Sequence, residues 1–389
     1  MRKSFLPVIA VRPLDCGHIE TAHQRIKEMQ PNRPHDPEPP TVFELEEALG
    51  ERVHKCKLWK SNWRNRIYRL ELASGVAVAK QLLTGNSAKL QCEFDQLRLL
   101  ARLEIPGLRV PKALALLPTK RAYVMESAPG KTIRGMLWNG SNGDDTLQAC
   151  DLAGKILARI HIAWTQSIRP IPVELLARDL AAAHWHLSLS QRKILQSAFR
   201  SLAKVEVSIG QIYGDYNPAN LLFKDGELYL IDPPSVVRRG VQLWDFSCFR
   251  SSMRRESWRL NLWRPFGRHA GMIKQSVAAF ERGYLGSLNE GDSARTLFTL
   301  AARLFDLHRT AVLITLEKGK IDIARKKMSV AGAYHLGYSL TNRVSLFLLK
   351  MEKCWLFRQL ARELPGYGPR ALCWLVLGVD LDLTYPPPA

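Results

Sequence analysis

The strongest constraint on the fold is a hairpin pattern near the middle of the chain. Residues 221–224 (LLFK) and 227–231 (ELYLI) are rich in strand-forming side chains, and Asp225-Gly226 lies between them. A two-residue type I′ turn needs positive φ at both central positions, and Asp-Gly is a favoured pair for such a turn. The pattern therefore predicts two antiparallel strands joined by a tight turn.

The register of this hairpin decides which side chains meet at its open end. With Lys224 opposite Glu227, Asn220 lies beside Asp232. A carboxylate and an amide oxygen together suit a hard cation such as Mg²⁺. Asp215 precedes Asn220 by five residues on an irregular loop and can reach the same cavity. We therefore expect three oxygen-bearing side chains at one point, and a polar turn that merely contains Asp and Asn is the alternative.

The first part of the chain alternates between strand and helix patterns. Residues 66–80 alternate apolar and polar side chains around a Gly-containing turn, which predicts a β-hairpin. Residues 86–103 place apolar side chains at helical spacing, with Ser87 as the expected N-cap. Residues 121–127 form a further strand candidate, and the chain beyond this point has mostly helical patterns apart from the central hairpin.

The order of these elements predicts an α+β chain with two lobes, a small β-rich N-lobe followed by a large, mainly helical C-lobe. Residues 31–40 are half proline, so residues 1–40 are expected to form an N-terminal extension with an extended linker. We expect the N-lobe over residues 41–125 and the C-lobe over residues 126–389.

Composition restricts the environment and the partners of the chain. The formal net charge is +20, and basic residues outnumber acidic ones after Asp245. Such a surface attracts anionic partners, namely nucleic acid, anionic lipid head groups or phosphorylated sugars, although a solvated basic surface is the alternative. The seven cysteines form no CxxC pair, which is typical of reduced thiols. No apolar run reaches the roughly 18–20 residues of a membrane-spanning helix.

The segment around the hairpin resembles a known family. Residues 213–222 (YGDYNPANLL) are similar to the catalytic segment H-G-D-x-x-x-x-N-x-L of the aminoglycoside phosphotransferase and choline kinase families, which have the protein-kinase-like fold. LIDPP at 230–234 and WDFS at 244–247 follow in the family's order. The resemblance covers roughly residues 50–250 and includes three upstream segments, WKSNWRNRIYRLELASGVAVAK (59–80), YVMESAPGKTI (123–133) and AGKILARIHIA (153–163).

This resemblance implies a role for each matching residue of the catalytic segment. Asp215 would be the catalytic base or would orient the acceptor hydroxyl, and Asn220 and Asp232 would hold magnesium. Asp245 would brace the catalytic loop. Phosphoryl transfer from ATP consists largely of positioning and charge neutralisation, which groups of this kind supply. The N-lobe would bind the nucleotide, and the C-lobe would carry the catalytic loop and bind the acceptor.

Lys80 and Glu93 complete the implied nucleotide site. By resemblance, Lys80 would contact the α- and β-phosphates of ATP, and Glu93 would pair with it. The residues themselves agree, because Glu93 lies on an apolar helix stripe where a carboxylate is costly without a cationic partner. The alternatives are a lysine at the end of a strand that reaches solvent and a glutamate at the edge of the stripe.

The sequence departs from the family pattern at three places. The segment KSNWRNR lacks the usual glycines, so Ser61, Asn62 and Asn65 are the expected phosphate-binding side chains. Tyr213 stands where the family usually has His, and two prolines follow Asp232. The missing glycines restrict the approach of backbone N–H groups to a phosphate.

We therefore expect an ATP- and Mg²⁺-dependent O-phosphotransferase that acts on a hydroxyl of a small molecule or glycan. The basic charge favours an anionic or membrane-presented acceptor, such as a lipopolysaccharide-type sugar, over a cationic aminoglycoside. A catalytically weak pseudokinase that binds nucleotide or scaffolds a partner is the main alternative, and nucleic-acid binding is supported by charge alone. We expect a cytoplasmic protein, with a peripheral position at the inner membrane surface as a second expectation.

Three features outside the catalytic segment have a structural interpretation. His161, at the end of a helix pattern, is expected to pack rather than to catalyse. The Arg- and Trp-rich segment 258–269 is typical of a helix with half-buried tryptophans, and binding of a glycan, a lipid or single-stranded nucleic acid is the alternative. Residues 371–379 (ALCWLVLGV) are expected to belong to the core or to touch a membrane surface.

Overall fold

The fold was analysed in a computed structural model. The model describes residues 37–62, 64–84, 86–140, 143–183, 185–263, 269–288, 292–328 and 334–364, with the backbone alone for 261–263, 269–270, 292–296, 323–328 and 334–341. The extension before residue 37, residues 264–268 of the Arg- and Trp-rich segment, and segment 371–379 lie outside the described residues.

Contacts divide the described chain into two compact units. The first unit contains residues 37–168 and 207–288, and the second contains residues 169–206 and 292–364. This division differs from the expected boundary at residue 126, because the β-rich segment and the central hairpin fall in one unit. The lobe boundaries at 41–125 and 126–389 therefore stay a prediction.

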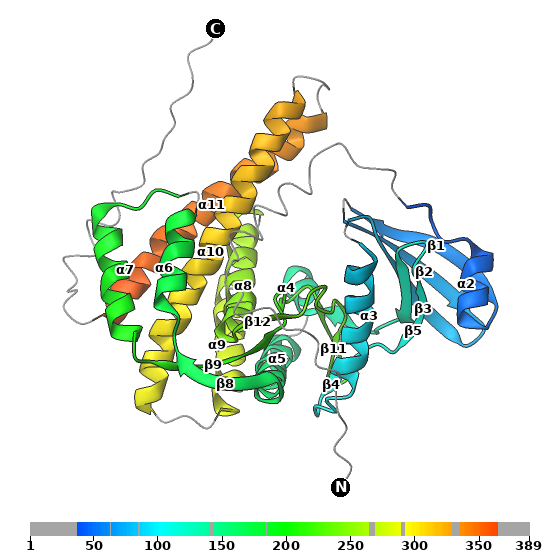
Figure 1. Cartoon of the computed structure of the whole chain (residues 1–389), viewed down its shortest axis with the longest axis horizontal. Helices are drawn as coiled ribbons and strands as arrows, with labels where there is room; N and C mark the ends of the chain where they lie inside the picture. The colour runs from blue at the N-terminus through cyan, green and yellow to red at the C-terminus, as the bar shows by residue number, and fades with distance from the viewer. Residues whose placement is uncertain are drawn as a thin grey trace. The chain divides into compact units, whose positions relative to one another are not determined.

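A five-stranded antiparallel sheet forms the β-rich part of the first unit. Its order is β1-β2-β3-β6-β5. Leu72 of β2 lies opposite Gly75 of β3, which confirms the predicted hairpin. In Figure 1, helices α2 and α3 lie on opposite faces of this sheet. The bounds are β1 (Val53–Ser61), β2 (Asn65–Leu72), β3 (Gly75–Leu82), β5 (Ala113–Leu117), β6 (Ala122–Glu126), α2 (Val42–Leu49) and α3 (Ser87–Ala101).

The two helices begin with side-chain caps that satisfy their first backbone N–H groups. Thr41 and Glu44 form a capping box at the start of α2. At α3 the N-cap is Asn86, whose side chain accepts the Lys89 N–H at 3.1 Å, so the expectation of Ser87 was wrong by one residue. Asn and Ser cap helices about equally well, so their order along the chain does not decide between them.

The last residues of the proline-rich segment belong to the fold. The side chain of Gln81 on β3 donates to the carbonyl oxygen of Glu38 at 2.6 Å, and Arg66 donates to that of Pro37 at 3.1 Å. The folded part therefore includes residues before the expected Thr41, because the carbonyl groups of Pro37 and Glu38 accept hydrogen bonds from side chains of the sheet.

The predicted central hairpin is present. Strand β10 (Leu221–Lys224) pairs with β11 (Glu227–Leu230) in the expected register, with Lys224 opposite Glu227. Asp225 and Gly226 have φ values of 51° and 79°, the positive values that a type I′ turn requires. The short strands β4 (Leu108–Arg109) and β7 (Lys131–Thr132) extend this hairpin to a four-stranded sheet in the order β4-β11-β10-β7.

Helices α4 and α5 contact the hairpin of β10 and β11, and α9 packs on α5. Figure 1 shows α4 and α5 next to β11 within the first unit. Helices α5 and α9 cross closely, because a Cβ at Gly154 would lie 2.1 Å from the carbonyl oxygen of Phe280 and one at Gly283 would lie 2.1 Å from that of Asp151. Phe280 also stacks on Phe249 of α8, with ring centroids 4.0 Å apart. The bounds are α4 (Ile133–Asn139), α5 (Gly143–Trp164), α8 (Leu243–Trp263) and α9 (His269–Gly286).

Three more strands, which the sequence patterns did not predict, form a sheet in the order β12-β9-β8. Its members are β8 (Thr165–Pro170), β9 (Glu206–Ile212) and β12 (Arg238–Val241). Strand β9 leads directly into the catalytic segment at Tyr213. The prediction of a mostly helical chain beyond residue 126 is therefore correct for its long elements and wrong for these short ones.

The second unit is helical. Its helices are α6 (Val173–Ala182), α7 (Leu189–Leu202), α10 (Asp292–Met328) and α11 (Tyr334–Glu363). A buried pair joins α10 to α6, with His308 Nε2 3.0 Å from Asp179 Oδ2. None of the helices in the described ranges combines the length and the apolar character needed to cross a membrane.

Candidate active site

A buried lysine brings together three of the residues singled out in the sequence. Lys80 on β3 places Nζ 2.8 Å from Oε2 of Glu93 on α3 and 2.5 Å from Oδ1 of Asp232, which follows β11. The side chains of Lys80 and Glu93 are 6% and 4% exposed, whereas that of Asp232 is 38% exposed. Tyr123 on β6 donates its hydroxyl to Glu93 Oε2 at 3.3 Å. The predicted Lys80–Glu93 pair is therefore present in the structure.

The charge of Lys80 is held by its surroundings. Burial alone lowers the pKa of a lysine, because it removes water from the ammonium group. Here the electrostatic effects of Asp232, Tyr123 and Glu93 outweigh that of burial, with Asp232 and Glu93 carrying the negative charge, and the pKa of Lys80 lies well above its ordinary value. Lys80 therefore stays cationic over the whole physiological pH range.

The predicted catalytic loop, residues 213–220, holds Asp215 and Asn220 next to each other. The Asn220 side-chain nitrogen donates to the backbone oxygen of Asp215 at 3.1 Å and lies 3.5 Å from its Oδ2. The backbone oxygen of Asn220 accepts the Ile231 N–H at 3.2 Å, which fixes the loop to the open end of the hairpin. Since its nitrogen is the donor, the amide oxygen of Asn220 is the end that can act as a metal ligand.

Asp245, at the start of α8, holds the backbone of the catalytic loop. Its two oxygens accept the N–H groups of Tyr213 and Gly214, each at 2.6 Å. The carboxylate is fully buried and also lies 3.4 Å from Nε2 of His161, whose Nδ1 is 2.8 Å from the Tyr284 hydroxyl. His161 therefore packs behind Asp245 and orients it, in keeping with the structural role expected from the sequence.

Tyr213 joins the catalytic loop to the loop that carries Asp232. Its hydroxyl donates a short hydrogen bond to the backbone carbonyl oxygen of Asp232. Burial, followed by the charges of Asp232 and Asp215, raises the pKa of Tyr213 well above its ordinary value, so the phenol stays a donor. The sequence showed only that tyrosine replaces the family's histidine. No sequence signal indicated this contact, because it links segments 19 residues apart.

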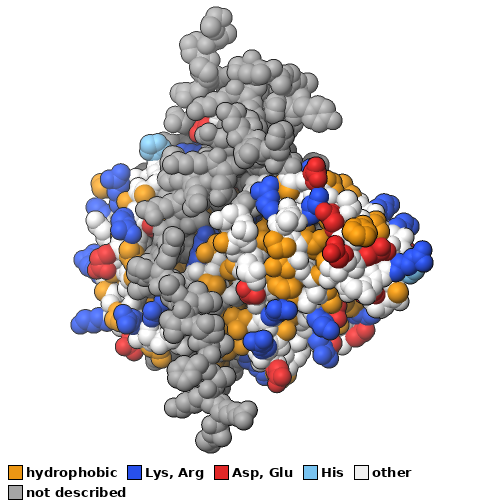
Figure 2. Space-filling view, turned by 45° about the vertical axis from the view of Figure 1, so that its right-hand side comes forward, with side chains coloured by type: hydrophobic (Ala, Val, Ile, Leu, Met, Phe, Trp, Pro, Cys, Tyr) orange, Lys and Arg blue, Asp and Glu red, His pale blue; other side chains and the backbone are white. Residues whose placement is uncertain are grey.

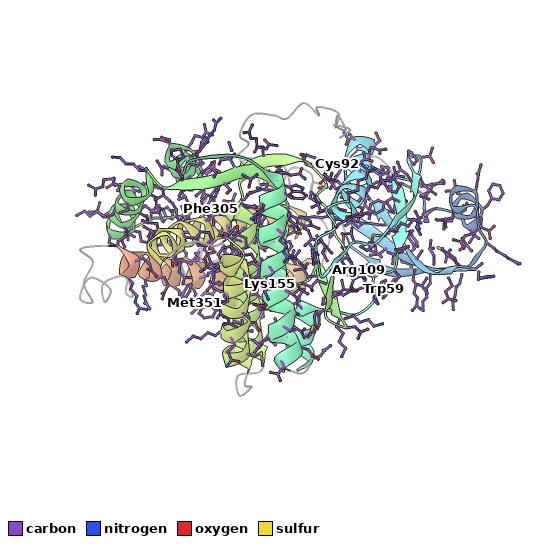
Figure 3. All side chains as sticks on the ribbon, turned by 90° about the horizontal axis from the view of Figure 1, so that it is seen from below. Trp59, Cys92, Arg109, Lys155, Phe305 and Met351 are labelled. Carbon is purple, nitrogen blue, oxygen red and sulfur yellow. The ribbon has the colours of Figure 1, made fainter. Side chains whose placement is uncertain are left out.

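The two prolines after Asp232 are packed against α3. Pro233 and Pro234 are both buried, and the Sγ of Cys92 lies 3.7 Å from the carbonyl oxygen of Pro234. Figure 3 labels Cys92, the residue immediately before Glu93 on α3. The Pro-Pro sequence therefore stiffens the loop at a point where it contacts the helix that carries Glu93.

The turn between β1 and β2 differs from the phosphate-binding expectation. Asn62 Oδ1 accepts the N–H groups of Arg64 and Asn65 at 2.8 and 2.9 Å, so these two donors are already satisfied within the turn. Among the described residues, no hydrogen bond or ion pair joins Ser61 or Asn65 to Lys80. Ser61 ends β1 and Asn65 begins β2, the strand that pairs with β3, on which Lys80 lies. The expected contacts of Ser61 and Asn65 with phosphate stay a prediction.

The oxygen ligands present suit magnesium in one specific way. Within the described ranges, no group of three or more His, Cys, Asp or Glu side chains is arranged to hold a metal ion. Mg²⁺, however, is commonly bound by one or two protein oxygens together with substrate phosphates and water. The amide oxygen of Asn220 and the half-exposed carboxylate of Asp232 fit this mode.

Comparison with known proteins agrees with this arrangement. The model of the phosphotransferase enzyme family (APH) matches residues 55–264, more than half of the chain. A candidate aminoglycoside phosphotransferase from Ralstonia eutropha JMP134 superposes with a TM-score of 0.51 at 14% identity, covering 83% of this chain and 97% of the other. At this identity the likeness shows the fold, a protein-kinase-like one with a β-rich and a helical part.

Two other solved structures are similar at lower scores. A candidate fructosamine-3-kinase from Thermobifida fusca has 19% identity and a TM-score of 0.43, with 79% and 98% of the two chains covered. A macrolide 2′-phosphotransferase from Brachybacterium faecium has 12% identity and a TM-score of 0.45, with 77% and 96% covered. A search of the curated proteins found no match. On the family match over residues 55–264, the chain belongs to the phosphotransferase enzyme family.

Proposed function

We propose that the chain transfers the γ-phosphoryl group of ATP, with Mg²⁺, to a hydroxyl group of a small molecule or glycan. The observation that carries this proposal is the contact of Lys80 with both Glu93 and Asp232. These residues come from three separate segments, and a buried ion cluster of this kind is costly unless its geometry is well satisfied. The family membership of the chain supports the same chemistry.

Each residue has a defined task in this proposal. Asp215 accepts the proton of the acceptor hydroxyl or orients that hydroxyl for attack on the γ-phosphorus. Lys80 binds phosphate oxygens, and Glu93 keeps it in place. Asn220 and Asp232 would hold Mg²⁺, which supplies positive charge to the phosphates when bound. Asp245 keeps the loop in position through the N–H groups that it accepts.

The class of acceptor follows from charge. A net charge of +20 attracts anions and repels a cationic aminoglycoside, so a sugar that is anionic or presented at a membrane, of the lipopolysaccharide type, is favoured. Figure 2 shows Lys and Arg side chains spread over the face in view, among acidic and hydrophobic ones. On the described residues of this face, the dispersed pattern does not form the clustered basic patch or stripe that is typical of a nucleic-acid-binding surface.

One observation favours a second candidate, a pseudokinase that binds nucleotide weakly and scaffolds a partner. The β1–β2 turn has no glycine, and Asn62 already occupies two of its backbone donors. Fewer N–H groups are then available to cradle phosphates. This candidate predicts nucleotide binding without phosphoryl transfer to any acceptor.

A nucleotide titration followed by unfolding temperature tests the proposal. ATP at about 100 times its dissociation constant adds roughly 2.7 kcal/mol to the free energy of unfolding. We expect this gain with Mg²⁺, its loss in EDTA, and its loss in Asp232→Asn. Asp225→Asn is the matched control, because it makes the same chemical change on the exposed turn of the same hairpin, where Asn tolerates the positive φ.

Turnover separates the two candidates. Slow ATP hydrolysis, or transfer to a sugar panel, that is lost in Asp215→Asn supports the transferase. Nucleotide binding with no hydrolysis in the wild type, unchanged by Asp215→Asn, would establish the pseudokinase. No stabilisation by ATP under any condition would reject the transferase and leave a scaffold that binds no nucleotide as the leading candidate.

A further inference from the structure

A buried carboxylate on α8 organises three donors beside the catalytic loop. Oε2 of Glu256 accepts the indole N–H of Trp138 at 2.7 Å. Oε1 accepts NH1 of Arg259 at 2.9 Å and lies 3.2 Å from Nε of Arg134. The side chain of Glu256 is only 8% exposed, so it holds these three donors in fixed positions, unlike a solvated ion pair at the surface. We call Glu256 with Trp138, Arg134 and Arg259 the Glu256 platform.

The two arginines on this platform carry more charge than their partner neutralises. Arg134 and Arg259 are 43% and 36% exposed, and within the described residues Glu256 is the one acid that either guanidinium contacts. Each guanidinium has five N–H donors, and contact with one shared oxygen uses only one or two of them. The outer edges of both groups are thus available to an anion with two or more oxygens, which is the ligand that a guanidinium fork recognises best.

Two backbone contacts tie this platform to the catalytic loop. The N–H of Arg134 donates to the carbonyl oxygen of Pro218 at 3.0 Å. Just before it, β7 pairs with β10, so that Thr132 lies opposite Leu222, two residues after Asn220. Arg134 is therefore held against the segment that contains Asp215 and Asn220.

Helix α8 makes the second connection. The Sγ of Cys248 lies 3.5 Å from the carbonyl oxygen of Gly214, next to Asp215. Cys248, Ser252, Glu256 and Arg259 follow one another at intervals of four, four and three residues, so they share one face of the helix. Glu256 is eight residues beyond Cys248, which is about 12 Å along the axis. The helix face that contacts the catalytic loop at Cys248 therefore reaches Glu256 and its arginine pair about 12 Å further along the axis, a distance that one small molecule can span.

We propose that Arg134 and Arg259, positioned by Glu256, bind an anionic group of the acceptor and so determine its specificity. The inference rests on the proposed function. The ligand group would be a phosphate or carboxylate on the acceptor, which directs the reacting hydroxyl toward Asp215. Arg134 and Arg259 are specificity-determining residues in this proposal, and Glu256 and Trp138 are positioning residues.

Calorimetric titration of three matched sugars tests this proposal. Glucose 6-phosphate, glucuronate and glucose share one ring and differ in the group at carbon 6. They are added to the full chain saturated with Mg²⁺ and ADP, which keeps the anions out of the nucleotide site. The two charged sugars are expected to bind more tightly than glucose, and the order between them shows whether phosphate or carboxylate is preferred.

Variants then locate the binding. Arg134→Gln and Arg259→Gln are each expected to weaken binding of the charged sugars by roughly 10- to 150-fold, the range of one hydrogen bond to a charged group, and to leave glucose unchanged. Arg109→Gln is the control of equal charge, since Arg109 pairs with Glu227 on the hairpin at 2.8 Å and is labelled in Figure 3.

The outcomes distinguish this inference from the proposed function. Equal binding of all three sugars, no binding of the charged ones, or an equal loss in Arg109→Gln would overturn the anion site, whatever the chain does with ATP. Failure of the nucleotide titration with charged sugars still bound through Arg134 and Arg259 would instead reject the transferase and retain the anion site.

Discussion

Replacing Lys80 by methionine removes the positive charge that lies between two carboxylates while keeping a side chain of similar length. Glu93, 4% exposed, would then be a buried carboxylate that still accepts a hydrogen bond from the Tyr123 hydroxyl. Asp232 is 38% exposed and can turn its charge toward water. The two acids therefore respond differently to the loss of the same lysine.

The magnitude follows from distance and exposure. Two unit charges 2.8 Å apart attract by roughly 6 kcal/mol at an effective dielectric constant of about 20. Breaking a buried pair by removing one partner typically costs about 3–5 kcal/mol, since the remaining charge stays desolvated. The half-exposed Asp232 contributes at most about 1 kcal/mol, because solvent screens its contact with Lys80. We therefore expect Lys80→Met to lower the free energy of unfolding by about 3–5 kcal/mol and Asp232→Asn by about 1 kcal/mol or less.

Urea unfolding of four proteins measures these differences, namely the wild type, Lys80→Met, Glu93→Met and the double variant. The double variant removes both buried charges, and replacement of a whole ion pair by apolar groups is often neutral. We expect it to be more stable than either single variant, with an interaction free energy of roughly 2–4 kcal/mol of opposite sign to the single losses. A Lys80→Met variant within about 1 kcal/mol of the wild type, or a double variant that simply adds the two single losses, would refute the reasoning.

Three other expectations can be checked with the same methods. Tyr213→Phe removes the hydroxyl that binds the Asp232 carbonyl oxygen, and should cost about 1–2 kcal/mol in urea unfolding and raise the Mg²⁺ concentration needed for nucleotide binding. Gly154→Ala should cost about 1–3 kcal/mol or more, because its Cβ would meet a backbone oxygen at 2.1 Å, whereas Gly271→Ala, with open space around it, should be neutral or slightly stabilising. Burial raises the pKa of Tyr123, Tyr213 and Tyr216. The folded chain then binds more protons than the unfolded chain above about pH 10, so stability should fall as the pH rises past that value, and absorbance at 295 nm should show these phenols ionising only as the chain unfolds.

Local patterns in the sequence predicted the elements that depend on short-range physics. Asp225-Gly226 fixed the hairpin register, because few residue pairs accept positive φ at two successive positions. That register placed Asn220 next to the loop of Asp232. The apolar stripe of α3 also indicated that Glu93 needs a cation, and Lys80 is that cation in the structure.

Contacts between distant segments could not be predicted in the same way. Arg134 and Glu256 are more than a hundred residues apart, and nothing in either segment specifies the other. Strand β9 was missed because its residues alternate weakly, and its pairing with β12 depends on tertiary contact. The net charge indicated an anionic partner, but only the fold shows which two arginines share one acid.

The buried charges also bear on the choice between an enzyme and a scaffold. A chain that only had to hold the first unit together would be as stable, or more stable, with apolar side chains in place of Lys80 and Glu93. The Lys80 cluster instead keeps an ammonium group at a point where β3, α3 and the loop after β11 meet, with Asp232 as its partly solvated neighbour. A positive charge fixed in that way is suited to polyphosphate, whose several negative charges need a partner that does not move. Since stability alone does not require this cluster, its presence supports nucleotide binding over a scaffold that binds no nucleotide, and the double variant at positions 80 and 93 tests this, because it should remain folded while it loses nucleotide binding.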